Sequence, residues 1–142
     1  MTRTIDQFQG KYRFLSNFWN CPVTYGGITY QNTEAAFQAQ KCTDPADRVH
    51  FSGLDPSSAK RRGRRVKLRP DWESVKDGLM ADIVTAKFEQ NPELAARLIA
   101  TAPAELIEGN SWGDTYWGVC GGQGENRLGL ILMAVRSKLA GN

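Results

Sequence analysis

The chain has 142 residues, 41% of them hydrophobic and four of them tryptophan, which is typical of one folded domain and excludes a disordered chain. The net charge is +3, the first residues lack the pattern of a signal peptide, so none is expected, and the longest apolar run, Leu130 to Val135, is far too short to span a membrane. Three cysteines without CxxC spacing and a single histidine indicate neither a disulfide framework nor a zinc site, so we expect a cytoplasmic protein without a metal.

The first thirty residues are expected to be extended. Val23 to Tyr25 and Ile28 to Tyr30 flank Gly26-Gly27, a pattern that predicts a β-hairpin with a two-residue turn. Asn32 can then cap a helix that reaches about Cys42.

Short and long helices are predicted for the rest of the chain. Asp44-Pro45 and Asp55-Pro56 each pair a capping residue with proline at the first helical position, and Gly63 lies where the second of these helices would stop. Asp71 can cap a longer helix, Asn91-Pro92 can start another, and a last helix is expected from about residue 126 to 139. The predicted fold is α+β, a single helix-rich domain over residues 1–142 with a small N-terminal hairpin or short sheet.

The helix after Asn32 has a narrow polar stripe. At about 100° per residue, Gln38 lies about 40° to one side of Glu34 and Lys41 about 20° to the other. Because side chains tilt toward the helix N-terminus, Lys41 is expected to reach back over Gln38 while Glu34 points away from both. The stripe is either a solvated surface or one wall of a cleft; the pattern alone slightly favours the surface.

A basic run follows the third predicted helix. Residues 60–69, KRRGRRVKLR, hold seven of the 18 basic residues; the other eleven oppose 15 acidic ones, so the rest of the chain carries −4. Mutual repulsion within the run favours an anionic partner such as phosphate over a solvated loop.

Residues 105–129, ELIEGNSWGDTYWGVCGGQGENRLG, form a glycine-rich loop with acidic and aromatic side chains. Trp112 and Trp117 offer flat faces for a base, and the free N–H groups of the helix that follows could accept a phosphate. The alternative is a folded loop packed on its own aromatics, and we favour a functional loop. In FLSNFW, Asn17 either caps a turn or binds a ligand, and the sequence does not choose.

With His50 as the one histidine, no catalytic triad can be built, which leaves carboxylates and lysines for catalysis. This inventory suits glycosidic chemistry, in which an acid protonates the leaving base, and a desolvated lysine adds Schiff-base chemistry.

The motifs YRFLSNFW, TYQNTEAAFQAQK, AKRRGRRVKLRPDW, GLMADIVTAKFEQNPELAARLIATAPAELIEGNSWGDTYWG and GENRLGLILMAVR resemble the NADAR, or YbiA-like, family from about Gly10 to Lys138. The resemblance implies a cofactor-free N-glycosidase. Its substrate would be a phosphorylated ribosylamino intermediate of riboflavin biosynthesis, or ADP-ribosylated guanine in DNA or RNA. No membrane and no obligate protein partner are implied.

The resemblance also implies site residues. The expected catalytic residues are Lys41, Glu34, Glu108 and Asp114, with Lys41 favoured over Lys60 as a Schiff-base lysine. The resemblance implies Asn17, Lys60, Arg64, Trp117 and Asn126 as substrate-binding residues. To these the basic run and the aromatic loop add Arg62 for phosphate and Trp112 for the base. The chain departs from the simplest family pattern in its additional arginines after Lys60 and in Cys120.

Two other functions stay open at this point. A non-catalytic module that binds ADP-ribose or a nucleotide would use the same pocket without turnover. A nucleic-acid-binding domain would use the basic run and would lose affinity steeply with salt.

Overall fold

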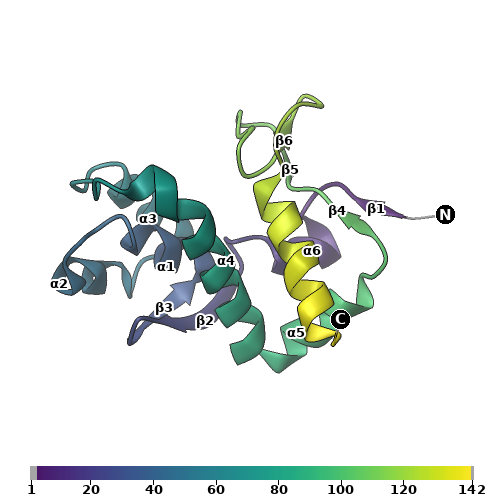
Figure 1. Ribbon diagram of the computed structural model, residues 1–142, viewed down its shortest axis with the longest axis horizontal. Helices are drawn as coiled ribbons and strands as arrows, with labels where there is room; N and C mark the ends of the chain where they lie inside the picture. The colour runs from purple at the N-terminus through teal and green to yellow at the C-terminus, as the bar shows by residue number, and fades with distance from the viewer. Residues whose placement is uncertain (1–2, 142) are drawn as a thin grey trace. The chain divides into compact units, whose positions relative to one another are not determined.

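The structure is a computed structural model that describes residues 3–141, and it confirms the predicted α+β class with helices dominant. The chain divides into two compact units. One is the continuous segment 17–91, and the other joins the segment ending at Ser16 to the segment that starts at Pro92. Figure 1 shows the elements of each.

The unit of residues 17–91 begins with the predicted hairpin. Strands β2 (Asn20–Tyr25) and β3 (Ile28–Asn32) are antiparallel, with Tyr25 opposite Ile28. Gly26 and Gly27 have φ of 59° and 81°, the positive values that a two-residue primed turn requires and that glycine adopts without strain.

Helix α1 (Thr33–Ala39) lies at the centre of this unit, and all seven of its residues are buried. It packs against the hairpin and against helices α3 and α4 (Figure 1). Asn32 caps it as predicted, since its side-chain oxygen accepts from the N–H of Ala35 at 2.7 Å. The remaining helices of the unit are α2 (Pro45–Arg48), the 3₁₀ turn η2 (Val49–Phe51), α3 (Pro56–Gly63) and α4 (Trp72–Gln90).

The caps of α2 and α3 agree with the sequence, but that of α4 does not. Asp44 and Asp55 accept hydrogen bonds from backbone N–H groups of their helices. The Asp71 carboxylate does not cap α4. It pairs with the guanidinium of Arg69 at 2.7 Å, because a bidentate ion pair two residues away competes with the backbone N–H groups.

The other unit has two short parallel pairings. β1 (Thr4–Ile5) pairs with β4 (Glu105–Leu106), and β5 (Gly109–Asn110) pairs with β6 (Val119–Cys120). The expectation of an entirely extended N-terminal segment was wrong, because the 3₁₀ helix η1 occupies Gly10–Leu15.

Helices α5 (Pro92–Ala100) and α6 (Arg127–Leu139) supply the helical part of this unit. They bury Leu98 and Leu132. The buried guanidinium of Arg136 donates to Thr101 Oγ1 at 3.0 Å and to the Ala104 carbonyl at 2.8 Å, which joins α6 to the turn after α5. Among residues 3–141, no helix is long and apolar enough to cross a membrane.

Candidate active site

The polar stripe of α1 is buried, and not the solvated surface that the pattern slightly favoured. Glu34 and Gln38 are only 8% and 6% exposed. Gln38 Nε2 donates to Glu34 Oε2 at 2.7 Å. The expectation that Glu34 points away from Gln38 was therefore wrong, because the glutamine side chain is long enough to reach the carboxylate one turn earlier.

Gly63, the last residue of α3, lies against the other atoms of the Gln38 amide. A Cβ at position 63 would collide with Gln38 Oε1 and would lie 3.3 Å from Gln38 Cβ. Within residues 3–141, Gln38 Oε1 is buried and accepts no hydrogen bond. The site thus presents a carboxylate that is held by the amide of Gln38, which is itself packed against Gly63.

Lys41 is half-buried just beyond the end of α1. Its Nζ lies 3.5 Å from the Gly63 carbonyl oxygen and 5.8 Å from the centre of the Trp72 ring. Burial lowers the pKa of Lys41, and the nearby cations Arg64 and Lys60 lower it further, whereas the Glu34 carboxylate raises it. The predicted residues Glu34, Lys60 and Arg64 therefore all act electrostatically on Lys41, and we call these four residues the Lys41 cluster.

Asn17 lies at the N-terminal end of α1. Its backbone carbonyl accepts from the Glu34 N–H at 3.0 Å, and its buried side chain places Nδ2 3.5 Å from Met80 Sδ. Asn17 is therefore positioned next to Glu34 by the backbone. The sequence placed Gln38 on the polar stripe and Gly63 at a helix end, but it did not give these two residues or Trp72 as site residues, because their importance depends on contacts between α1, α3 and α4.

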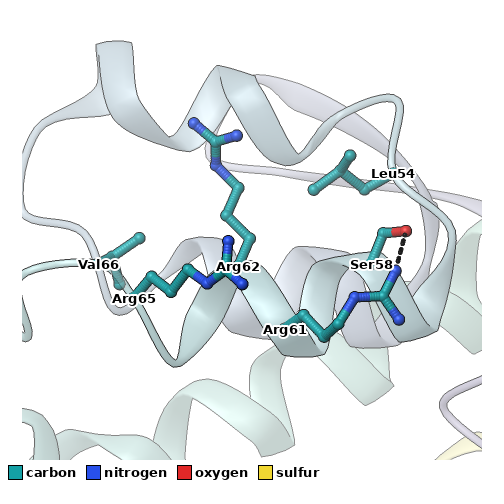
Figure 2. Close-up of a pocket in the computed structure, with 6 residues that line it drawn as sticks. All are labelled: Leu54, Ser58, Arg61, Arg62, Arg65 and Val66. Atoms are coloured by element: carbon teal, nitrogen blue, oxygen red, sulfur yellow. Dashed lines mark hydrogen bonds between the residues drawn. The ribbon is translucent and has the colours of Figure 1, made fainter.

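The basic run divides between different surroundings. Lys60 and Arg64 belong to the Lys41 cluster, whereas Arg62 lines a pocket of about 400 Å³ together with Arg61 and Arg65 (Figure 2). Arg69 has a third role, since it donates to the Gln40 carbonyl at 3.3 Å and its own N–H donates to the Lys41 carbonyl at 3.0 Å. It holds the chain directly after α1 in place.

In the other unit, Asp114 and Glu108 are both tied into the glycine-rich loop. Asp114 Oδ1 accepts from the N–H groups of Tyr116 at 3.1 Å and Trp117 at 2.9 Å, which forms a tight Asx-type turn. Asn110 bridges the two acids, with its Nδ2 3.0 Å from Glu108 Oε1 and 2.9 Å from the Asp114 carbonyl.

Asn126 joins this loop to the start of α6. Its Oδ1 accepts from the Glu108 N–H and its Nδ2 donates to the Leu106 carbonyl, both at 2.9 Å, and its φ of 53° lies in the left-handed region that asparagine tolerates. The sequence predicted that free N–H groups at the start of α6 could bind a phosphate, but two of these N–H groups are not free. Those of Arg127 and Leu128 donate to the carbonyls of Tyr116 and Trp117.

The two predicted tryptophans differ in exposure. Trp112 is 59% exposed, at the tip of the loop. Trp117 is partly buried and meets Tyr116 edge to face, with ring centres 4.9 Å apart. Trp112 therefore offers an open stacking face, whereas Trp117 helps to pack the loop.

Comparison with known proteins identifies the family. The NADAR domain model matches residues 5–140, across both units. The chain is 47% identical over 133 residues to N-glycosidase YbiA of Escherichia coli, an alignment that covers 91% of this chain and 82% of that protein.

The chain belongs to the NADAR domain family. The NMR structure of E. coli YbiA matches it with a TM-score of 0.86 at 44% identity, covering 99% of this chain and 87% of that one. A riboflavin biosynthesis protein of Vibrio vulnificus is 40% identical over 131 residues, which are 89% of this chain but only 35% of that longer protein. The resemblance found in the sequence is confirmed, and so is the enzyme class, a hydrolase of the N-glycosidase type.

Proposed function

We propose that this NADAR protein hydrolyses the N-glycosidic bond between a base and a phosphorylated ribose or ADP-ribose. The observation that carries the proposal is the Lys41 cluster, in which a half-buried lysine of lowered pKa lies just beyond the end of the helix that carries a buried carboxylate, Glu34. Breaking a C1′–N bond requires a proton for the departing base and electron density for the sugar carbon. The cluster holds a group for each task.

Lys41 is the proposed nucleophile. Its lowered pKa increases the fraction of neutral amine near neutral pH, and only the neutral amine has a lone pair to donate. That lone pair bonds to C1′ as the C1′–base bond breaks, and the base leaves with a proton from the acid. The C1′–O4′ bond then breaks, the nitrogen passes a proton to the ring oxygen, and the open sugar stays bound to Lys41 as an imine. Water then hydrolyses the imine, which releases the ribose and restores Lys41.

Glu34 is the proposed partner of Lys41. Gln38 fixes its carboxylate through the 2.7 Å hydrogen bond, so Glu34 is oriented before any substrate binds. It would protonate the base or stabilise positive charge at C1′. Lys60 and Arg64, which are close enough to affect the pKa of Lys41, would hold the substrate phosphate, and Asn17 would complete this wall.

The loop of the other unit supplies the remaining candidates. Glu108 and Asp114 stay alternatives to Glu34 as the acid. Asp114 is the weaker one, because its Oδ1 already accepts two backbone hydrogen bonds. We propose that the exposed Trp112 stacks on the base. Asn126 and Trp117 would act by shaping the loop, and one family model spanning both units supports a single functional domain.

Two substrate classes are compared to test the proposal. A ribosylaminopyrimidine phosphate is favoured by the riboflavin-related name of the Vibrio relative, and ADP-ribosyl-guanine in DNA is favoured by the basic run. Free base released from each is measured by chromatography with wild-type protein, Lys41→Arg and Glu34→Gln. We expect release from at least one substrate and a loss of at least about 100-fold in each variant.

Binding of ADP-ribose without base release from either class would contradict the proposal and would indicate a binding module. The cytoplasmic setting stays a prediction from the sequence.

A further inference from the structure

A second group of cations lies on α3 and in the turn directly after it, apart from the Lys41 cluster. Arg61, Arg62 and Arg65 line the pocket of about 400 Å³, with Leu54, Ser58 and Val66 completing its wall (Figure 2). Nothing in the Lys41 cluster requires these three arginines.

Helix geometry separates the two groups. When the rotation of about 100° per residue is continued past the end of α3 at Gly63 to Arg64 and Arg65, Lys60 and Arg64 fall within about 40° of each other. Arg61, Arg62 and Arg65 fall on an arc centred roughly 130° away from that pair. The face that carries Gly63 packs on α1 through Gln38, so the arginine pocket opens on a different side of α3 from the face that contacts α1.

The pocket arginines have no close carboxylate partner among the described residues, although Arg61 is near enough to Asp55 to help lower the pKa of that carboxyl. Arg61 is oriented by Ser58, whose Oγ accepts from Nη2 at 3.1 Å, and the Arg62 guanidinium lies 5.7 Å from the centre of the Phe51 ring. Two of the arginines are thus held in place without losing their charge, which is the state in which a guanidinium binds phosphate oxygens.

The pocket also has an apolar part. Leu54 and Val66 lie beside the guanidinium groups in Figure 2. Aliphatic walls next to cations suit a phosphate that is attached to a sugar, because the sugar carbons can pack where the phosphate oxygens cannot.

We propose that this pocket is a second phosphate site, which binds a phosphate of the substrate other than the one held by Lys60 and Arg64. The inference rests on the proposed function for the identity of the substrate, but not for the presence of the site. The phosphate comes from one of two sources of the same chemistry: the pyrophosphate of a free ADP-ribosyl group, or the backbone of a nucleic acid that carries the modified base. A ribosylaminopyrimidine monophosphate would leave the pocket empty.

Binding is measured with inorganic pyrophosphate, ADP-ribose and a short single-stranded DNA as probes, by titration of the full chain. We expect Arg62→Gln and Arg65→Gln each to weaken at least one probe by about tenfold, the usual loss for one charge-assisted contact. If the DNA is the probe affected, each substitution should also reduce the slope of log K against log salt by about 0.7. Lys67→Gln is the matched control, since it removes one exposed charge from the same run outside the pocket.

NMR of the arginine Nε–H groups locates the contact. Pyrophosphate or DNA should shift the signals of Arg61, Arg62 and Arg65 and leave that of Arg69, which is paired with Asp71, in place. If the arginine variants lose affinity for pyrophosphate or ADP-ribose, the pocket binds the phosphate of a free nucleotide. If they lose affinity for DNA alone, it binds the backbone of a nucleic acid.

The inference would be overturned if Arg62→Gln and Arg65→Gln bound all three probes as tightly as wild type. It would also be overturned if Lys67→Gln lost as much affinity as they do. Because binding is read without turnover, these results stand even if no base is released from any substrate.

Discussion

Single residues in the Lys41 cluster act on the lysine in opposite directions. Burial, Arg64 and Lys60 lower the pKa of Lys41, and Glu34 raises it. We therefore expect Glu34→Gln to lower the pKa of Lys41 further and Lys60→Gln to raise it. NMR of ¹³C-methylated lysine, followed through a pH titration, measures both shifts. Shifts of the same sign in the two variants would contradict this arrangement of charges.

The same environment predicts the pH dependence of the reaction. If the neutral amine is the nucleophile, kcat/KM rises with pH as Lys41 loses its proton, and the midpoint lies below the ordinary lysine pKa of about 10.4. In Lys60→Gln the midpoint should move to higher pH. A rate that falls as Lys41 deprotonates would instead assign the charged form as the active one.

Lys87 is a second unusual lysine, fully buried in α4 at 1% exposure. Burial lowers its pKa to about 8, although Cys21 acts in the opposite direction. Because this value lies below that of the unfolded chain, the folded state binds fewer protons between about pH 8 and 10.5. Its contribution to the free energy of unfolding therefore rises with pH over that window.

Replacing Lys87 removes the free-energy cost of burying its charged ammonium group at neutral pH. We expect Lys87→Met to raise the free energy of unfolding at pH 7 by on the order of 1–3 kcal/mol and to flatten its rise above pH 8. Urea denaturation at pH 7 and pH 9 measures both effects, with exposed Lys67→Met as the control. A variant that is less stable than wild type at both pH values would show that contacts of the ammonium group outweigh its desolvation.

Among the elements, the contact between α1 and α3 depends on one glycine. A methyl group at Gly63 meets the buried Gln38 side chain, whereas one at Gly78 in the middle of α4 meets nothing within 4 Å. We expect Gly63→Ala to destabilise the protein by about 1–3 kcal/mol and to lower activity, because Gln38 must release Glu34. Gly78→Ala should stabilise it by roughly 0.5–1 kcal/mol. Thermal unfolding compares the two, and a Gly63→Ala variant with normal stability and activity would show that Gln38 moves at no cost.

The boundaries of the elements were largely predictable because their signals are local. Gly26-Gly27 fixed the hairpin turn, and Asn32 and Asp55 capped α1 and α3 as expected. The cap of α4 was not predictable, because Arg69 competes for the Asp71 carboxylate.

The site was predictable only in part. Helical spacing placed Glu34, Gln38 and Lys41 on one stripe, but the burial of that stripe depends on packing from α3, α4 and the hairpin. The sequence likewise could not show which residues of the basic run belong to the Lys41 cluster and which to the arginine pocket. Their neighbours in space come from other elements: Lys41 from the end of α1, and Phe51 from η2.

For the molecule as a whole, both units contribute candidate residues. Residues 17–91 contain the Lys41 cluster and the arginine pocket, and the other unit contains Trp112 and the loop fixed by Asp114 and Asn126. The family model covers both. Lysine chemistry in the first unit is the central requirement of the proposed N-glycosidase.

Reduction with borohydride during turnover, read by the intact mass of the full chain, tests that chemistry. Wild-type protein with its substrate should gain the mass of the reduced sugar, with peptide mapping to Lys41, and Lys41→Arg should gain nothing. The absence of any substrate-dependent adduct during active turnover, or an adduct that persists in Lys41→Arg, would contradict the role of Lys41.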